Sequence, residues 1–210
     1  MSEQHTVAGI AAPLPLNNLD TDQIMPKQFL LGIDKSGLAG GLLYDLRMDG
    51  AGLPRPEFVL NQPHYQHARI LIGGTNFGCG SSREHAVWGL QQAGFEAVIA
   101  PSFGEIFYFN ALNNRLLLIM LEPQTVAELM ARVARADQSF LTIDVQAQSV
   151  LTSDGATYHF ALPERQKRMF IEGRDMIGMT LRDSDAIAAF ETRHHAAHPW
   201  MRINLPLQQA

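Results

Sequence analysis

The residue types best suited to chemistry are concentrated in one short segment, residues 76–86. In order, its central part reads Gly78, Cys79, Gly80, Ser81, Ser82 and Arg83. An apolar run typical of a buried strand precedes the segment and a helical apolar spacing follows it, so we expect a strand-to-helix turn. Free N–H groups at a helix start favour a carboxylate, a phosphate or an alkoxide, and an arginine can pair with a carboxylate through two hydrogen bonds. The segment therefore predicts an anion site.

Familiar glycine-rich motifs do not fit this spacing. A dinucleotide-binding motif that starts at Gly78 would need its third glycine where Arg83 stands. Gly73 and Gly78 have the spacing of a phosphate-binding loop, but Cys79 occupies the position of the required lysine. Neither serine lies in the Gly-x-Ser-x-Gly pattern of hydrolases. The predicted anion site therefore belongs to another class.

A purely structural explanation of the turn is also open. Ser81 and Glu84 have the spacing of a capping box, in which the serine hydroxyl caps the helix and the glutamate reaches back to it. A simple cap does not need the preceding glycines, and the helix dipole disfavours an arginine in the first turn. These neighbours favour a functional turn over a cap alone.

The composition of the chain is that of a compact globular protein. It has 210 residues, of which 46% are hydrophobic and 18% are charged, and its formal net charge is −5. We expect one domain over residues 1–210, with a flexible loop region at 26–52 and a tail at 196–210 that is disordered or contacts a partner. The negative charge argues against nucleic acid as the main partner. The sequence has neither an apolar run that could span a membrane nor a secretory signal pattern, which predicts a cytoplasmic location.

Cysteine and histidine usage predicts no metal site on this chain. Cys79 is the single cysteine, so the chain alone can form neither an intrachain disulfide nor a cluster held by several thiolates. The histidines at 64, 67, 194, 195 and 198 lack the supporting cysteine or carboxylate spacing of a metal site. We expect them to be solvated or hydrogen-bonded.

Alternating strand and helix patterns predict an α/β fold. The predicted strands are Val7–Leu16, a stretch near Phe58, Ala68–Ile72, Ala97–Ala100, Leu116–Leu121, Phe140–Val150 and Thr157–Leu162. The predicted helices are residues 26–31, 86–93, 102–114, 123–136, 163–173 and 183–195. This order implies crossover connections and a mixed, largely parallel sheet flanked by helices, with a long loop near the N-terminus. The turn signal at residues 153–155 predicts a hairpin between the last two strands.

The run from Gly78 to Ala86 resembles the active-site turn of the swivelling domain of the aconitase superfamily, which reads Gly-x-Gly-Ser-Ser-Arg-Glu-His-Ala. Further segments agree in the same order: Asp20-Thr21-Asp22 with Ile24 and Pro26, Ala100 to Phe103 with Ile106, Asn110, Asn113 and Asn114, and Asp175 to Leu181. The agreement covers nearly the whole chain. A free-standing chain of this length is similar to the small subunits of the isopropylmalate dehydratase (isomerase) family. The resemblance implies a single swivelling β/β/α domain of the aconitase type.

The resemblance also assigns roles within the turn. Ser81 would be the catalytic base that removes a proton from carbon, and Arg83, with Ser82 beside it, would bind a substrate carboxylate. A serine alkoxide is normally inaccessible near neutral pH, so the site must stabilise negative charge strongly. We assign this stabilisation to the helix-end backbone at Gly78 and Gly80.

The segment before the turn is implied to contact substrate as well. Asp22 would have a supporting polar role, unless it is only a turn residue. The loop that follows Asp22 would choose the substrate, and it contains Lys27, Phe29 and Leu30 but lacks the arginine with which aconitase binds an extra carboxylate. Phe29 and Leu30 would suit an isopropyl group, because burying it is favourable. Packing of both side chains into the domain or against a partner is the open alternative.

The resemblance further implies a partner, a cofactor and a reaction. In this family a large subunit holds a [4Fe–4S] cluster, which acts as a Lewis acid on a departing hydroxyl. This chain would bind no cofactor, would complete the active site of the large subunit and would act on a small dicarboxylic hydroxy acid. Loss and re-addition of water through 2-isopropylmaleate would interconvert 2-isopropylmalate and 3-isopropylmalate in leucine biosynthesis. Cys79 would have a packing role.

Two other hypotheses stay open at this point. The chain could be the small subunit of a related hydro-lyase that acts on methylmalate or citraconate, on dimethylmalate or on homoaconitate. Alternatively, it could be a non-catalytic anion-binding module with the same fold. A comparison of substrates distinguishes the first hypothesis, and the absence of turnover with a large subunit distinguishes the second.

Overall fold

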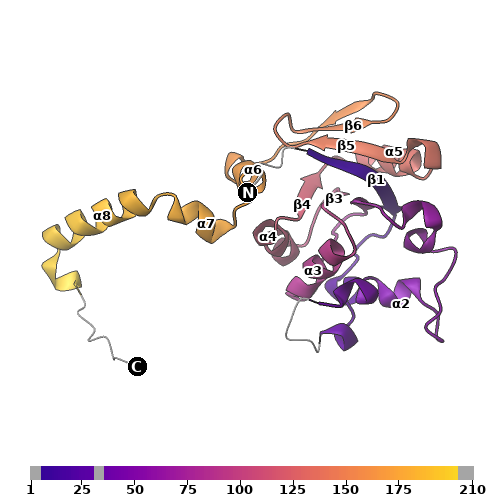
Figure 1. Ribbon diagram of the computed structural model, residues 1–210, viewed down its shortest axis with the longest axis horizontal. Helices are drawn as coiled ribbons and strands as arrows, with labels where there is room; N and C mark the ends of the chain where they lie inside the picture. Colours follow the sequence, from indigo (N-terminus) through magenta and orange to yellow (C-terminus); the bar gives the residue numbers. More distant parts are fainter. Residues whose placement is uncertain (1–5, 31–35, 203–210) are drawn as a thin grey trace. The chain divides into compact units, whose positions relative to one another are not determined.

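Most of the predicted apolar runs become strands of one seven-stranded sheet. The computed structural model describes residues 6–30 and 36–202, and the chain divides into two compact units, Met1–Asp175 and Met176–Ala210 (Figure 1). The strands are β1 (Thr6–Leu14), β2 (Ile70–Gly73), β3 (Ala97–Ala100), β4 (Leu117–Met120), β5 (Phe140–Asp144), β6 (Ser149–Thr152) and β7 (Thr157–His159). All of them belong to the first unit. The single-domain organisation of residues 1–210 stays a prediction.

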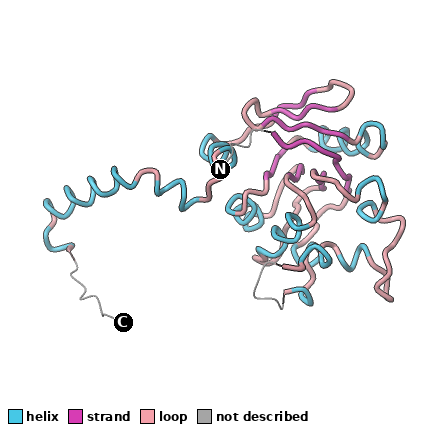
Figure 2. The backbone as a smooth tube through the Cα atoms, viewed as in Figure 1, coloured by secondary structure: helices cyan, strands magenta, loops and turns pink. Residues whose placement is uncertain are grey.

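The sheet combines a parallel half with an antiparallel half. Its strand order is β4-β3-β2-β1-β5-β6-β7, and the strands are drawn in magenta in Figure 2. The neighbours among β1 to β4 are parallel, whereas β5 to β7 continue from β1 in antiparallel pairs. The mixed α/β fold predicted from the sequence is confirmed.

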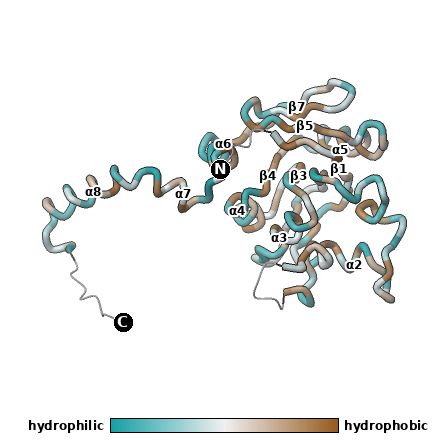
Figure 3. The backbone as a smooth tube through the Cα atoms, in the orientation of Figure 1, coloured by the Kyte–Doolittle hydropathy of each residue, from teal (hydrophilic) through white to brown (hydrophobic). Residues whose placement is uncertain are grey.

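Helices cover both faces of the sheet because successive side chains of a buried strand point to opposite sides. Leu71 belongs to one core cluster, and its neighbours Ile70 and Ile72 belong to the other. The first core packs against α1 (Thr21–Ile24), α3 (Glu84–Gln92) and α4 (Glu105–Asn113), and the second packs against α5 (Pro123–Val133) and α6 (Glu164–Ile171). Figure 3 shows the hydrophobic colour of β3 and β4 between these layers. The turn between β2 and α3 packs against the first core, through Phe77.

The described part of the predicted loop region 26–52 is folded into short helices. It contains η1 (Lys27–Phe29), η2 (Leu38–Gly41) and α2 (Tyr44–Arg47), and Leu38, Leu42 and Leu43 are buried in the first core. Residues 31–35 lie outside the described residues. The flexibility of this region and its contact with substrate stay predictions.

Two local predictions were wrong. The stretch near Phe58 is not a strand, because Phe58 precedes the 3-10 turns η3 (Val59–Asn61) and η4 (Pro63–Tyr65). The long strand predicted over residues 140–150 is divided into β5 and β6 by a turn without Gly, Pro or Asn. In this turn Gln148 has a φ of 52°, and the Asp144 carboxylate accepts a hydrogen bond from the N–H of Ala147 at 2.7 Å. Such a side-chain-supported turn has a weak sequence signal.

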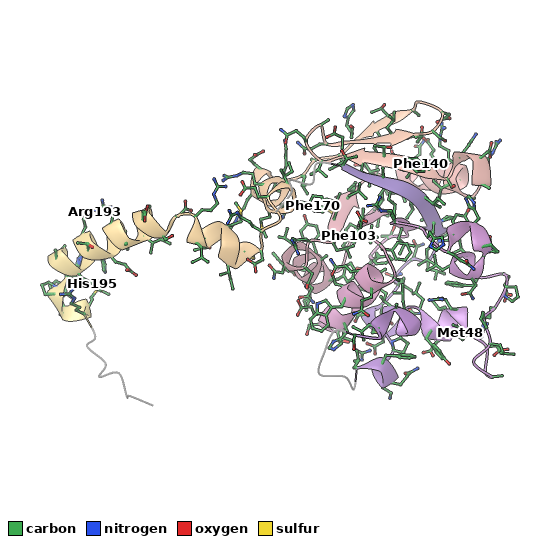
Figure 4. The ribbon with its side chains drawn as sticks, in the orientation of Figure 1. Met48, Phe103, Phe140, Phe170, Arg193 and His195 are labelled. Carbon is green, nitrogen blue, oxygen red and sulfur yellow. The ribbon has the colours of Figure 1, made fainter. Side chains whose placement is uncertain are left out.

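The second unit is helical in the part that the structure describes. It contains α7 (Met176–Leu181), which sequence patterns missed, α8 (Ser184–Ala197) and η6 (Pro199–Met201). Figure 4 shows Arg193 and His195 on α8. The predicted tail 196–210 thus begins within a helix, and residues 203–210 lie outside the described part.

Candidate active site

The turn between β2 and α3 follows a path that requires glycine at two positions. Gly78 and Gly80 have φ angles of 73° and 91°, in the left-handed region that side chains with a Cβ rarely adopt. A Cβ on Gly78 would lie 2.3 Å from the Phe107 ring, and a Cβ on Gly80 would lie 3.3 Å from the Cβ of Asp20. The glycines therefore let the turn pass closely between α4 and the segment that begins α1.

A cluster of three phenylalanine rings packs at the base of the turn. Phe77 is fully buried, and its ring centroid lies 5.5 Å from that of Phe107 and 6.2 Å from that of Phe103, which is labelled in Figure 4. The backbone of Phe77 accepts a hydrogen bond from Gly104 at 2.9 Å and donates to Ser102 at 3.0 Å. The base of the turn is thus fixed to the segment that leads into α4.

The start of α3 differs from the predicted capping box, which was wrong. The helix begins at Glu84, and its N-cap residue, Arg83, makes no side-chain capping hydrogen bond. The Glu84 carboxylate instead accepts a hydrogen bond from the Asn114 side chain at 2.5 Å. Ser81 lies before the N-cap residue, so its hydroxyl is available for another partner. A capping box is present at α1, where Asp20 and Gln23 satisfy each other's backbone N–H groups.

The segment at the start of α1 is bonded to the turn through the backbone. The N–H of Gly78 donates to the Leu19 carbonyl at 2.7 Å, and the N–H of Thr21 donates to the Cys79 carbonyl at 2.8 Å. Asp20 and Cys79 also form a parallel bridge. These contacts join two segments about sixty positions apart, and the Thr21 hydroxyl adds a further bond to the Ser81 carbonyl at 2.7 Å, with a separation of 60.

The structure brings together Ser81, Asp22 and Arg83. The Ser81 hydroxyl donates to Asp22 Oδ1 at 3.0 Å, and Arg83 Nη1 lies 2.8 Å from the same oxygen. Arg83 Nη1 also donates to the carbonyl of Met25 at 3.2 Å. The side chain of Asp22 is 59% exposed and that of Arg83 is 19% exposed, so the group is open to a ligand on the Asp22 side. The site thus combines a hydroxyl, a carboxylate that can accept a proton, and a cation that can bind an anionic substrate.

The remaining predicted residues lie around this group with different degrees of access. Ser82 is exposed in the same turn. The N–H of Gly78 is already bonded to Leu19, so in this structure it does not point to a ligand. Cys79 is half-buried, and its carbonyl is bonded to Thr21.

The apolar residues of the predicted substrate loop are partly packed against the protein. Phe29 is half-buried, and its ring centroid lies 5.0 Å from that of Tyr44. A Cβ on Gly41 would lie 2.6 Å from the Phe29 ring. Leu30 is also half-buried against the first core, whereas Lys27 is exposed. Part of each apolar side chain is therefore used for packing, and their role in substrate binding stays a prediction.

Sequence reasoning missed two groups that contact the site, the Thr21 hydroxyl and the Met25 carbonyl. Thr21 lies in the segment that carried the family resemblance, and this position was the only available signal. A hydrogen bond to a carbonyl far away in the sequence has no local pattern, so its partner could not be predicted.

The part of the chain that the structure describes has neither a metal-ligand cluster nor a membrane-spanning helix. In residues 6–30 and 36–202, no group of three or more His, Cys, Asp or Glu side chains is placed to hold a metal ion. Among the helices of the same ranges, none has the length and apolar character needed to cross a membrane.

Comparisons with known proteins assign the chain to a family. Residues 1–124 match the sequence model of the aconitase C-terminal domain, and residues 176–202 match that of the C-terminal domain of the 3-isopropylmalate dehydratase small subunit. A relative from Chromobacterium violaceum, named 3-isopropylmalate dehydratase small subunit 1, is 60% identical over 199 residues, which cover 94% of this chain and 93% of the relative. This chain belongs to the family of 3-isopropylmalate dehydratase small subunits.

Other members of the small-subunit family agree with this assignment. The 3-isopropylmalate dehydratase small subunit of Phenylobacterium zucineum is 46% identical over 191 residues, covering 91% of this chain and 94% of the relative. The crystal structure of a 3-isopropylmalate dehydratase from Methanocaldococcus jannaschii superposes with a TM-score of 0.63 at 26% identity, covering 89% of this chain and 99% of that one. The protein is thus a member of a dehydratase family, and its fold is that of a solved relative.

Proposed function

We propose that this chain is the small subunit of 3-isopropylmalate dehydratase. With a large subunit, it interconverts 2-isopropylmalate and 3-isopropylmalate in leucine biosynthesis, by loss and re-addition of water through 2-isopropylmaleate. The observation that carries the proposal is the meeting of Ser81, Asp22 and Arg83 within hydrogen-bond distance, in a chain of this family. We further propose that the chain acts in the cytoplasm as part of a heterodimer with the large subunit.

Dehydration begins with the removal of a proton from carbon, and Ser81 is the residue we assign to this step. Its hydroxyl proton has an acceptor in the structure, because it already points to Asp22 Oδ1 at 3.0 Å. When this proton moves to Asp22, the Ser81 alkoxide takes the proton of the substrate carbon. The C–H electron pair then forms the double bond while the hydroxyl leaves the neighbouring carbon and departs as water, taking up the proton that Asp22 received, and rehydration reverses these changes.

Arg83 holds the substrate and stabilises negative charge beside Ser81. A guanidinium can bind a carboxylate through two parallel hydrogen bonds, which fixes the orientation of the substrate as well as its position. The carbonyl of Met25 anchors one nitrogen of Arg83 from the protein side. Ser82 is the neighbouring exposed hydroxyl and adds a further contact to the substrate carboxylate, while Gly78 and Gly80 allow the turn to pack closely against Phe107 and Asp20.

This chain does not have the residues for an iron–sulfur cluster. Such a cluster is held by several thiolates, and the chain has one cysteine. We therefore assign the [4Fe–4S] cluster to the large subunit, where it would supply the Lewis acid for the departing hydroxyl. Phe29 and Leu30 are the proposed contacts of the isopropyl group, through the parts of their side chains that are not packed against the core.

Reconstitution with a large subunit under anaerobic conditions tests the proposal. The isolated chain should give no turnover, and the complex should act on isopropylmalate with a higher kcat/KM than on citraconate or homoaconitate. Turnover by the isolated chain would contradict the two-subunit site. A preference for citraconate or homoaconitate would instead identify a related hydro-lyase. A stable complex without turnover on any of the three compounds would favour an anion-binding module.

A further inference from the structure

Thr21 is a buried polar residue at the edge of the candidate site. It is 1% exposed, and the described part of the chain has only two other buried polar or charged residues, Ser139 and Thr152. A buried hydroxyl needs a hydrogen-bond partner, because burial without one leaves its lost hydration uncompensated. The partner of Thr21 is the carbonyl of Ser81, at 2.7 Å. The buried hydroxyl thus binds directly to the backbone of the proposed catalytic residue.

The Ser81 carbonyl is held from two sides. It accepts one hydrogen bond from the N–H of Arg83 at 2.8 Å and one from the Thr21 hydroxyl at 2.7 Å. The first bond is local to the turn and would persist if the whole turn moved. The Thr21 bond ties the Ser81 carbonyl to another element, α1, beside the backbone bonds that join Gly78 and Cys79 to the same segment.

The same element carries the group to which the Ser81 side chain points. Asp22 follows Thr21 directly, and its carboxylate accepts the Ser81 hydroxyl. The N–H of Thr21 donates to the Cys79 carbonyl at 2.8 Å, and its own carbonyl accepts from Met25 at 3.0 Å. One residue of α1 therefore sets the distance between the Ser81 backbone and the Asp22 side chain.

We propose that Thr21 is a positioning residue, whose hydroxyl holds Ser81 at the distance from Asp22 that proton transfer requires. This inference rests on the proposed role of Ser81. Removal of the hydroxyl leaves the local Arg83 bond and the backbone bonds of Gly78 and Thr21 in place, but it removes the contact that holds the Ser81 backbone itself against α1. A displacement of about 1 Å at a reacting group can cost about 10²-fold in rate, so the effect should fall on kcat.

Two substitutions separate the hydroxyl from the shape of the side chain. Thr21→Val keeps the volume and removes the hydroxyl, whereas Thr21→Ser keeps the hydroxyl. In the complex with the large subunit, Thr21→Val should lower kcat by about 10- to 100-fold with KM changed less than about 3-fold, since Arg83 keeps its contacts to Asp22 and Met25. Thr21→Ser should have a kcat within about 3-fold of the parent.

Thr152→Val is the matched control. Thr152 is also a buried threonine, and in the β6–β7 hairpin its hydroxyl donates to the Asp154 carboxylate and accepts a hydrogen bond from the N–H of Ala156 at 2.9 Å. This variant should lower Tm and leave kcat per complex unchanged. If Thr21→Val does not fold, Thr21→Ala and Thr21→Ser form the test, and Thr21→Ser must be the more active of the two.

The outcomes distinguish this inference from the proposed function. A Thr21→Val complex with the parental kcat, beside an inactive Ser81→Ala complex, would overturn the positioning role alone. A loss of Tm with the parental kcat per assembled complex would also overturn it, because it would show a structural role. An active Ser81→Ala complex would instead contradict the proposed function itself.

Discussion

Two regions of the first unit use nearly the same side chains and differ in what they can do. The turn cluster consists of Ser81, Asp22 and Arg83, and the hairpin cluster consists of Thr152, Asp154 and Arg132. In each, one aspartate accepts a hydrogen bond from a hydroxyl and pairs with an arginine. Ser81 is exposed on a glycine-supported turn, whereas Thr152 is buried. The accessible hydroxyl, rather than the bonding pattern, therefore distinguishes a reactive site from a structural contact.

The two clusters are also built over different distances in the sequence. Thr152 and Asp154 are two positions apart in one hairpin, and Arg132 reaches them from α5. Ser81 and Asp22 are 59 positions apart and meet only because α1 is bonded to the turn. The contact between Thr152 and Asp154 is local to the hairpin, whereas the contact between Ser81 and Asp22 joins segments that follow the paired strands β1 and β2.

Paired aspartate variants should give the largest difference between the clusters. Asp22→Asn keeps the size of the side chain but removes its ability to take the Ser81 proton, so kcat of the complex should fall about 10²-fold, in the range of a lost acid–base group. Asp154→Asn should lower Tm and leave kcat unchanged. Steady-state kinetics and thermal unfolding of both complexes provide the measurement. Equal kcat values for the two variants would show that the turn cluster has no catalytic role that the hairpin cluster lacks.

Paired arginine variants should give a smaller difference. Arg83→Lys keeps the charge but loses the forked contact with a carboxylate, so kcat/KM should fall about 30-fold, the scale of one charged hydrogen bond. Arg132→Lys should not change kcat/KM, because its contact with Asp154 lies in the hairpin. The ratio of the two kcat/KM values measures the effect. A parental value for Arg83→Lys would show that this residue does not bind the substrate carboxylate.

The smallest expected effect is a pH dependence of stability at the hairpin cluster. The pKa of Asp154 lies below its ordinary value of 3.8, because the Thr152 hydroxyl and the Arg132 guanidinium donate hydrogen bonds to its carboxylate. Stability from this group is fully present above pH 3.8 and is lost as the pH falls through the lower pKa of the folded state. The Tm difference between the parent and Asp154→Asn should therefore shrink in acid. A Tm difference that stays constant into acid would contradict this linkage.

The sequence predicted the elements whose signals are local. Continuous apolar runs identified β3 and β4, and the amphipathic spacing identified α5, because each pattern reflects burial of that element alone. The strand predicted over residues 140–150 failed at Gln148, where the chain turns with a positive φ despite a residue type that gives no turn signal.

The site could be predicted only in part. The types and spacing of Ser81 and Arg83 indicated an anion site, and the family resemblance added Asp22. The capping box failed because the Ser81 hydroxyl points to Asp22 rather than to the helix start. Contacts such as the one between Thr21 and the Ser81 carbonyl depend on how distant segments meet, and a single sequence does not encode them in any local pattern.

The most direct test of the central claim, that Ser81 transfers the proton, is the turnover of a complex with Ser81→Ala, measured per assembled complex. The account predicts normal assembly with the large subunit and a fall in kcat of about 10³-fold, the scale of a lost proton-transfer group. Near-parental kcat in a fully assembled complex would contradict it.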